Sequence, residues 1–350
     1  MKKNKMIAAA ICCALFLTAC GNQSPVEQIS RPPIASSASV NSRLPESSAE
    51  SSSSSYASGE SGSKAGLNGS SGLSETQSVR TEASKPVSQP EEVSLCKGYA
   101  LYCIDDDKML DSLNEDERIA PASLTKLLTA AVAFRYVKPD EVFTVGTEQE
   151  LVNEDSSLSF IAPGQMLTMY DLVTGLLLPS GNDAAYTIAV STARKVSGDL
   201  GMPDKQAVDY FCRLMNEMAR ELGMNSSYFS DPDGWDDPLH YTTVSDLVKI
   251  SKYALTVPEI REIISLPEKY VEFETGENVN WFNGNKLLHS DSDYYCENAI
   301  GMKTGSTDDA GLCLIAAFVK NRKTYITVVV GSEEDEDRYN KTLRLFDEIS

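Results

Sequence analysis

Histidine and positive charge are both scarce in this chain. Its 350 residues include only two histidines, His240 and His289, which disfavours most mechanisms that depend on a histidine base. The chain holds 31 Lys and Arg against 51 Asp and Glu, a formal net charge of −20. Binding to nucleic acid or to an anionic membrane surface is therefore disfavoured, because both attract basic proteins.

The sequence also lacks an apolar run long enough to span a membrane. One apolar stretch, residues 6–19, follows three lysines among the first five residues. As a helix rising ~1.5 Å per residue it would reach about 21 Å, short of a ~30 Å hydrocarbon core. The pattern predicts a signal peptide over residues 1–19. It ends in LTAC, which resembles a bacterial lipobox and implies cleavage before Cys20 and lipidation of Cys20.

Cysteines in zinc-ligand spacing are absent, so neither a metal nor another cofactor is predicted. Beyond Cys20 the chain has five cysteines: Cys96, Cys103, Cys212, Cys296 and Cys313. An odd number outside the cytoplasm leaves at least one thiol without an intramolecular disulfide. We expect most of them to be small buried side chains, and their pairing is left open.

Residues 20–93 are rich in Ser, Gly, Pro and Glu and have almost no apolar periodicity. Such a segment cannot bury enough apolar surface to offset the entropy lost on ordering. It predicts a flexible tether with a typical reach of about 45–50 Å. The remaining residues, 94–350, are enough for one sizeable core in one or two lobes.

Strand patterns lie near both ends of residues 94–350, and helix patterns lie between them. The predicted strands are 98–105, a short one after the turn at 105–107, 270–273, 298–303, 312–319 and 324–330. The predicted helices are 123–137, 168–178, 184–193, 205–222, 242–255 (capped by Thr242 or Thr243) and 336–349. This order predicts an α+β fold with one antiparallel sheet from both chain ends, a hairpin loop at 321–323 and an inserted helical lobe.

Three short motifs follow one another: SLTK at 123–126, SGN at 180–182 and KTG at 303–305. Each is weak alone, and Ser-x-x-Lys also occurs at 61–64 and 94–97. Only the copy at 123–126 stands at a predicted helix start, where residues i and i+3 share a face. Lys126 can then reach the Ser123 hydroxyl, and the helix N-terminus favours developing negative charge.

The chemistry of these residue types suits acyl transfer. A serine hydroxyl needs a base, and Lys126 can act as one if burial and a nearby cation, predicted to be Lys303, lower its pKa. Ser180 offers a second hydroxyl that could pass the proton to a leaving amine. The Asn182 amide could bind a substrate backbone and neutral Lys126.

The third motif stands at the end of a predicted strand, whose edge can pair with an extended peptide. The Lys303 ammonium and the Thr304 hydroxyl could hold a terminal carboxylate. Gly305, with no side chain, would let substrate approach the backbone.

The ordered trio resembles the penicillin-binding protein and serine β-lactamase superfamily. Further similarity narrows this to low-molecular-mass serine D-alanyl-D-alanine carboxypeptidases of peptidase family S11. The similar stretches are 121–129, 179–184, 215–234, 283–288 and 301–313, and the resemblance covers roughly residues 95 to 348. It implies a β-lactamase/transpeptidase-like α/β fold, with peptidoglycan stem peptides as substrates and β-lactams as covalent inhibitors.

The resemblance also implies a role for each motif residue. Ser123 would be acylated by the penultimate D-Ala carbonyl, with Lys126 as base, Ser180 as proton shuttle and Asn182 positioning the substrate. Lys303 and Thr304 would bind the terminal carboxylate, and the N–H groups of Ser123 and Ser306 would form the oxyanion hole. His240 is interpreted as structural and His289 as a surface residue.

Two departures from the family are expected. The chain ends soon after the last predicted helix, so the further β-rich domain and the C-terminal amphipathic anchor of many such enzymes are expected to be absent. A lipid on Cys20 would replace that anchor and hold the exported enzyme at the outer face of the bacterial cytoplasmic membrane. Ser306 stands where a larger residue is common, which should tune specificity without abolishing activity.

Three alternatives stay open. A class A β-lactamase is favoured by Glu-x-x-x-Asn spacing at 221–225, but Gly181 stands where Asp is usual and the flanking residues fit the carboxypeptidases better. A non-enzymatic wall-binding lipoprotein is disfavoured because all the motif residues are present. A D,D-endopeptidase or an esterase of the same mechanism differs only in substrate.

Overall fold

The computed structural model describes residues 96–349. The predicted signal peptide over 1–19, the lipidation site Cys20 and the tether over 20–93 lie outside these described residues. Within the described part, no helix combines the length and the apolarity that crossing a membrane requires.

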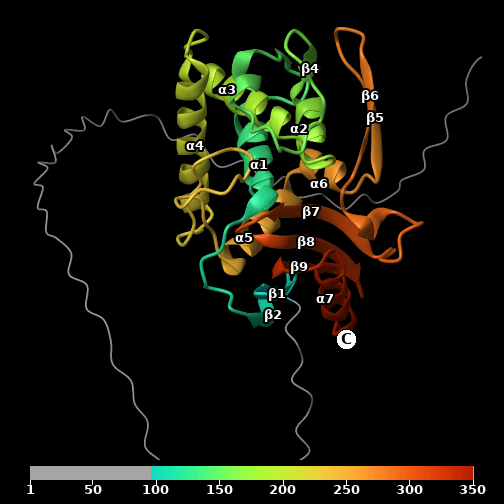
Figure 1. The fold of residues 1–350 in the computed structure, drawn as a ribbon. Coiled ribbons are helices and arrows are strands. Elements are labelled where there is room, and N and C mark those ends of the chain that lie inside the picture. Colours follow the sequence, from blue (N-terminus) through green and yellow to red (C-terminus); the bar gives the residue numbers. More distant parts are fainter. Residues whose placement is uncertain (1–95, 350) are drawn as a thin grey trace, which may run out of the picture. The chain divides into compact units, whose positions relative to one another are not determined.

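A five-stranded antiparallel sheet joins the two ends of the described chain (Figure 1). In spatial order its strands are β2 (Lys108–Leu113), β1 (Gly98–Cys103), β9 (Lys323–Ser332), β8 (Gly311–Lys320) and β7 (Ala299–Thr307). β1 pairs with β9 from Gly98 opposite Val330 to Cys103 opposite Tyr325. The predicted sheet made from both chain ends is therefore confirmed, and β7 lies at its edge.

The turn between β8 and β9 has the geometry of a two-residue hairpin. Asn321 and Arg322 both have positive φ, 54° and 64°, and Lys320 pairs with Lys323 on either side. Two consecutive positive φ angles match the right-handed twist of the flanking strands. The predicted hairpin is confirmed, with Lys323 inside the second strand and not in the loop.

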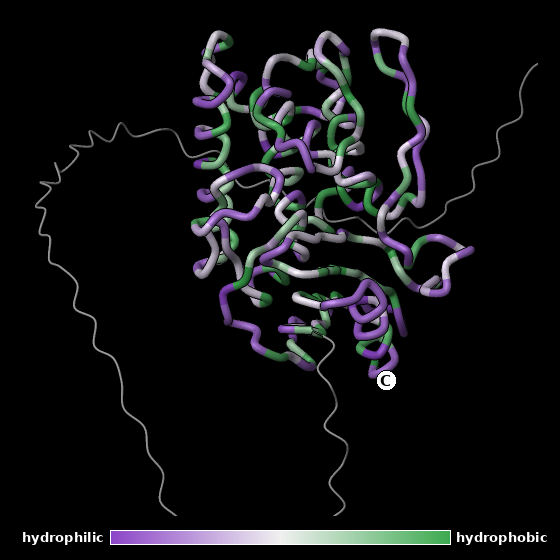
Figure 2. The backbone as a smooth tube through the Cα atoms, viewed as in Figure 1, coloured by the Kyte–Doolittle hydropathy of each residue, from purple (hydrophilic) through white to green (hydrophobic). Residues whose placement is uncertain are grey.

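Alternate residues of β8 belong to two different cores, because successive side chains of a strand point to opposite faces. Leu314, Ala316 and Phe318 pack with Tyr339 of the closing helix α7 (Asp335–Asp347). Ile315 and Ala317 pack into the larger core on the opposite face, which the other helices share. Figure 2 shows α7 as mostly hydrophilic, as expected for a helix that covers a sheet from the solvent side.

The helical lobe is built around α1 (Lys126–Tyr136), whose residues from Lys126 to Phe134 are all buried. A helix that is buried on all sides is surrounded by other elements of the fold. The lobe also contains α2 (Met169–Leu177), α3 (Asn182–Ser197), α4 (Asp204–Glu221), α5 (Val244–Thr256) and α6 (Pro258–Ile264). The five helices predicted between the strands are confirmed as α1 to α5. Thr243 caps α5 as predicted, its side chain accepting from Asp246 N at 3.1 Å.

Several short elements escaped prediction. β3 (Val142–Thr144) pairs with β4 (Met166–Thr168), and β5 (Glu268–Glu272) pairs with β6 (Asn278–Phe282). Only part of β5 and none of the other three strands was predicted, because strands of this length carry too little pattern. The helix α6 and the 3-10 helices η2 (Thr147–Leu151) and η3 (Lys286–Leu288) were also missed.

The cysteines follow their predicted role as small buried side chains. Cys96, Cys103, Cys212 and Cys313 are buried, and Cys296 is half-buried. Burial raises the pKa of the Cys96 and Cys313 thiols to about 11, so both stay protonated at neutral pH.

Candidate active site

Ser123 and Lys126 form the first part of the site. Ser123 lies in the 3-10 helix η1 (Ala122–Thr125), and Lys126 is the first residue of α1. The Lys126 Nζ donates to Ser123 Oγ at 2.7 Å and to the main-chain oxygen of Asp233 at 2.8 Å. The predicted reach of the lysine is confirmed, although the α-helix begins at Lys126 and not at Ser123.

The second and third motifs meet across the site. Ser180 has a positive φ of 65°, a conformation that few residues other than glycine adopt. Its Oγ accepts a hydrogen bond from Lys303 Nζ at 2.8 Å, and the same Nζ donates to Thr304 O at 2.8 Å. A non-glycine residue with a positive φ persists where the surrounding structure holds the turn in place.

Asn182 begins α3 and is buried, but it does not contact Lys126 as predicted. Its Nδ2 donates to Ser156 Oγ at 2.9 Å, and its main-chain N–H donates to Ser157 O at 2.8 Å. The Asn182 Oδ1 is buried and has no hydrogen-bond partner. That oxygen is an acceptor available to a substrate N–H.

Gly305 brings the edge strand against the nucleophile. A Cβ at Gly305 would lie 3.1 Å from Ser123 N and 3.2 Å from Leu124 N. The missing side chain therefore admits the backbone of Ser123. The predicted approach of substrate to Gly305 stays a prediction. β7 runs through the motif to Thr307, so Thr304, which is half-buried, and Ser306, which is exposed, both lie on the edge strand.

Burial lowers the pKa of both lysines. Lys126 is fully buried, which lowers its pKa to about 8, while the carboxylates of Asp233, Asp231 and Asp183 oppose that shift. Burial also lowers the pKa of Lys303 well below its usual value, and the positive charges of Lys126 and Arg338 add to the effect. The lowered pKa of Lys126 was predicted from burial and a nearby cation. Burial is its main cause, and Lys303 is not among the groups that shift it.

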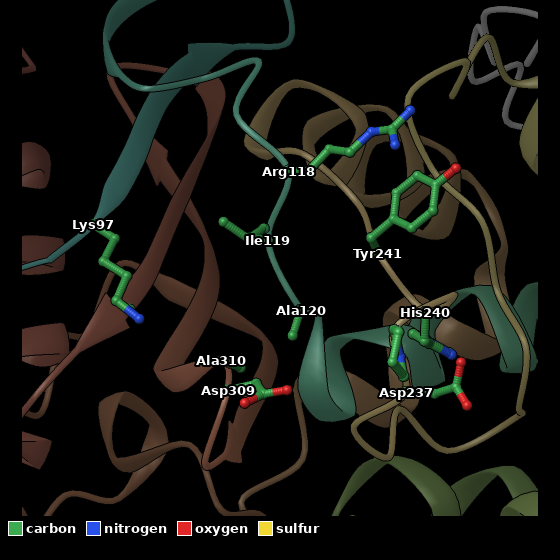
Figure 3. A pocket seen from close by; sticks show the side chains of 11 residues that line it. Lys97, Arg118, Ile119, Ala120, Asp237, His240, Tyr241, Asp309 and Ala310 are labelled. Atoms are coloured by element: carbon green, nitrogen blue, oxygen red, sulfur yellow. The ribbon is translucent and has the colours of Figure 1, made fainter. Parts of the chain in front are cut away.

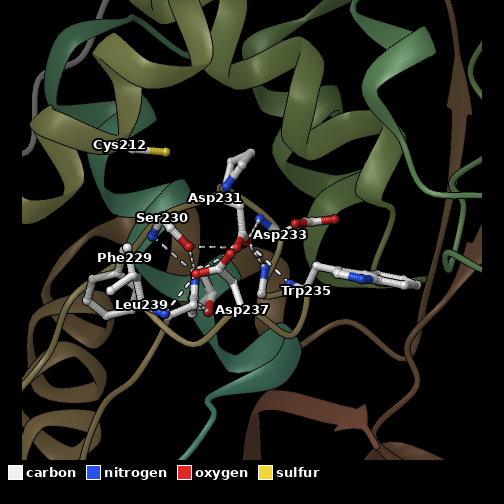
Figure 4. A network of polar contacts seen from close by, with 12 residues as sticks. Cys212, Phe229, Ser230, Asp231, Asp233, Trp235, Asp237 and Leu239 are labelled. Carbon is white, nitrogen blue, oxygen red and sulfur yellow. Dashed lines mark hydrogen bonds and ion pairs between the residues drawn. The ribbon is translucent and has the colours of Figure 1, made fainter. Parts of the chain in front are cut away.

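A loop from Phe229 to His240, absent from the predicted site, supplies the main-chain oxygen of Asp233 that accepts from Lys126 Nζ. Figure 4 shows the polar contacts within this loop. Asp231 Oδ1 accepts from the main-chain N–H groups of Asp233, Gly234 and Trp235 at 3.2, 2.6 and 3.3 Å. Asp231 Oδ2 lies 2.7 Å from His240 Nδ1. The similarity of residues 215–234 to the carboxypeptidases pointed to this loop, but nothing in the sequence indicated which of its acids face the lysine.

The loop is attached to the nucleophile's helix at two points. Thr129 Oγ1 donates to Pro232 O at 2.6 Å, and Thr125 Oγ1 lies 2.9 Å from His240 Nε2. The buried His240 thus connects Asp231 to η1, which agrees with its predicted structural role. His289 is half-buried, and its Nε2 lies 2.6 Å from Asn283 O.

Gly234 packs directly on the residue before the nucleophile. It has a φ of +90°, and a Cβ there would lie 1.8 Å from Ala122 O. Ala122 itself has a positive φ of 49°. Both unusual conformations occur where the loop and η1 touch, so this contact helps to set the direction of Ser123.

A cavity of about 310 Å³ lies beside the segment that leads to Ser123 (Figure 3). Its lining includes Lys97, Arg118, Asp237 and Asp309, and none of the motif residues. The reacting groups are therefore outside it. Among residues 96–349, no cluster of three His, Cys, Asp or Glu side chains could hold a metal ion.

Comparison with known proteins agrees with this geometry. The profile of the family described as D-alanyl-D-alanine carboxypeptidase, Peptidase S11, matches residues 86–334. The chain is 28% identical over 254 residues to D-alanyl-D-alanine carboxypeptidase DacF of Bacillus subtilis, covering 72% of this chain and 61% of that protein. It is 32% identical over 248 residues to D-alanyl-D-alanine carboxypeptidase DacC of Escherichia coli, covering 68% of this chain and 57% of that protein. The chain thus spans about 60% of the length of these relatives.

Solved structures show the same architecture. The Streptomyces K15 DD-transpeptidase superposes with a TM-score of 0.66 at 27% identity, covering 75% of this chain and 98% of that one. Penicillin-binding protein D2 of Listeria monocytogenes, in its cefotaxime-bound form, gives a TM-score of 0.60 at 27% identity. The match covers 74% of this chain and 98% of that one.

Proposed function

Because this chain belongs to the Peptidase S11 family of D-alanyl-D-alanine carboxypeptidases, we propose that it removes the terminal D-Ala from peptidoglycan stem peptides through an acyl-enzyme on Ser123. The observation that carries the proposal is the 2.7 Å hydrogen bond between Ser123 Oγ and the buried Lys126 Nζ. A nucleophile in direct contact with a base of lowered pKa is what acyl transfer requires.

In the acylation step, Ser123 Oγ attacks the carbonyl carbon while its proton passes to Lys126 Nζ. The developing oxyanion would be held by the main-chain N–H groups of Ser123 and Ser306. The close approach of Gly305 to Ser123 N supports this pairing, since it brings the two backbone segments together. Loss of one such donor typically costs ~10²–10³ in rate.

The departing D-Ala amine needs a proton and its carboxylate needs a cation. Ser180 would carry the proton from Lys126, and Lys303 orients the Ser180 hydroxyl at 2.8 Å. Lys303 and Thr304 would bind the carboxylate, and the unpartnered Asn182 Oδ1 would accept a substrate N–H. Water then releases the acyl chain from Ser123, and a β-lactam would acylate the same oxygen.

The decisive experiment measures D-Ala released from diacetyl-Lys-D-Ala-D-Ala together with the intact mass after penicillin treatment, followed by peptide mapping. We expect release by the wild type and a covalent adduct on Ser123. Ser123→Ala should lose both, whereas Ser94→Ala, in a second copy of the Ser-x-x-Lys pattern, should keep both. Activity retained in Ser123→Ala would contradict the proposal.

The class A β-lactamase alternative receives no support from the position of Glu221. Its side chain is 56% exposed and forms an ion pair with Arg135 on the surface of the helical lobe. A deacylating glutamate has to reach a water beside the nucleophile. Rapid nitrocefin turnover, in place of a slow covalent burst, would nevertheless favour that alternative.

We also propose that the enzyme is exported and anchored by lipid on Cys20 at the outer face of the cytoplasmic membrane. The support is the sequence LTAC after a short apolar stretch, both outside the described residues. The tether of residues 20–93 would then carry the catalytic domain into the wall layer, where stem peptides are found.

A further inference from the structure

The carboxyl group of Asp233 is buried, and within residues 96–349 no N–H or O–H group stands in good hydrogen-bond geometry to either of its oxygens, although the Trp235 N–H and the Asp231 carboxyl are near enough to affect its pKa. The residue is 1% exposed. A buried carboxylate is normally paired or hydrogen-bonded, because removing its charge from water is costly. The exception at this position calls for a specific role.

Asp233 lies directly against the general base. Its main-chain oxygen accepts from Lys126 Nζ at 2.8 Å, and the other partner of that Nζ is Ser123 Oγ. Covalent geometry keeps a carboxylate within about 5 Å of its own carbonyl oxygen. The Asp233 carboxyl and the Lys126 Nζ therefore share one buried region, where charges interact more strongly than in water.

The backbone of Asp233 is held by bonds that do not involve its carboxyl. Asp231 Oδ1 accepts from the N–H groups of Asp233 and Gly234, and Pro232 O accepts from Thr129. Gly234 packs on Ala122 O. A change of the Asp233 side chain therefore leaves the attachments of the loop in place.

We propose that Asp233 is a positioning residue of acylation, whose carboxylate is the counter-charge for the ammonium that Lys126 forms when it takes the Ser123 proton. This inference rests on the proposed function. In the step, the Ser123 O–H bond breaks and a Lys126 N–H bond forms, while Oγ bonds to the carbonyl carbon and the π electrons move to its oxygen. Lys126 gains one positive charge, and Asp233 stays ionised and exchanges no proton.

Among the three carboxylates that raise the pKa of Lys126, Asp233 is the one available for this task. Asp183 accepts from the N–H groups of Ser159 and Ile161, and Asp231 is bonded by His240 and by its own loop. Burial and the charge of Asp231 raise the pKa of Asp233 to about 7, and Lys126 opposes that rise. Asp233 is then ionised in the pH range where Lys126 begins to lose its proton.

Other titratable groups also face this region and enter the pH dependence. The loop contributes Asp231 and His240, and α1 contributes Lys126. The remaining groups are Asp183 and Tyr186 from α3, Cys212 from α4 and Lys303 from β7. Burial raises the pKa values of Tyr186 and Cys212, so both are neutral at physiological pH. The pKa values of Asp233 and Lys126 lie at about 7 and about 8, and burial lowers the pKa of Lys303 as well.

The test measures the rate of acylation by fluorescent penicillin from pH 5.5 to 9.5, in wild type and in Asp233→Asn, Asp233→Ala and Asp237→Asn. We expect the rate of the wild type to rise with pH around the pKa of Lys126, about 8. Both neutral variants at Asp233 should move this midpoint down by on the order of one pH unit and lower the plateau by roughly tenfold. Asp237→Asn removes an exposed charge from the same loop and should match the wild type.

The outcomes separate this inference from the proposed function. An unchanged midpoint and plateau in both Asp233 variants, or an equal shift in Asp237→Asn, would overturn the role of Asp233 alone. Unfolding of both variants, seen by circular dichroism, would also overturn it, because the carboxyl would then serve the loop. A wild type that penicillin does not acylate at any pH would overturn the proposed function, and the inference with it.

Discussion

Lys303 donates a hydrogen bond from Nζ to Ser180 Oγ at 2.8 Å, joining the edge strand β7 to the turn before α3. This bond connects the second and third motifs across 123 positions of sequence. It fixes the direction of a hydroxyl that would otherwise rotate freely, and it leaves that hydroxyl's own proton available.

Removal of the Ser180 hydroxyl should therefore slow the chemistry and spare the fold. We expect Ser180→Ala to lower kcat for D-Ala release by ~10²–10⁴, the usual contribution of a positioned proton carrier. Steady-state kinetics with thermal denaturation checks this. Ser265→Ala, which removes an exposed hydroxyl at the end of α6, is the control, and equal rates in the two variants would contradict the role of Ser180.

The stability of the protein should depend on pH through Asp233. Its pKa is raised from 3.8 to about 7 by burial and by Asp231, so the folded state binds more protons than the unfolded state in that window. This contribution to stability is present below about pH 3.8 and is lost as the pH rises through about 7. The free energy of unfolding of Asp233→Asn minus that of the wild type should therefore be larger at pH 8 than at pH 5.

Urea unfolding of the two proteins at both pH values measures this difference. Asn has nearly the shape of a protonated Asp and carries no charge at either pH. If the stability difference between variant and wild type is the same at pH 5 and pH 8, Asp233 does not titrate as described.

The contact between Gly234 and Ala122 can be tested with two glycines of similar backbone conformation. Gly234 and Gly276 have φ of +90° and +98°, but a Cβ at Gly234 would lie 1.8 Å from Ala122 O and one at Gly276 has nothing within 4 Å. Gly276→Ala should cost about 1–2 kcal/mol of stability from its backbone conformation alone. Gly234→Ala should cost at least ~3 kcal/mol and also reduce acylation, because it displaces η1.

Equal losses of stability in the two glycine variants, measured by urea unfolding, would show that the packing on Ala122 contributes little. Acylation of the folded fraction by penicillin separates the loss of fold from the displacement of Ser123.

The proposed lipid anchor makes a prediction about cell fractions. Cys20→Ser removes the thiol that would be lipidated, so the protein should be released from the membrane fraction or retained as an uncleaved precursor. Immunoblotting of membrane and soluble fractions measures this, with Cys96→Ser as the control for loss of a thiol. Wild-type fractionation of Cys20→Ser would contradict the anchor.

Prediction from sequence succeeded where the signal is local or repeats along the chain. The i, i+3 spacing of Ser123 and Lys126 placed both on one face, and the hydrogen bond between them confirms it. Alternation located β1, apolar stretches located β8 and β9, and long periodic stretches located the main helices. The short strands β3, β4 and β6 escaped because a few residues carry little periodicity.

Prediction failed where a side chain's partner comes from a distant segment. Asn182 was expected to contact Lys126, yet Ser156 is its partner. The contact of Gly305 with the backbone of Ser123 was not predicted. Asp233 was not considered at all, because its relation to Lys126 spans 107 positions and follows from a loop with no repeating pattern.

The sequence by itself determined the residue types of the site, their order and the helix and strand on which they stand. These follow from local backbone preferences and from the spacing of apolar residues. Only the tertiary structure decided how far the pKa values of Lys126 and Lys303 are lowered, because loss of solvent lowers the pKa of a lysine and packing removes the solvent. It also decided which acids face Lys126 and which glycines allow backbones to touch, because both depend on contacts between segments that are distant in sequence.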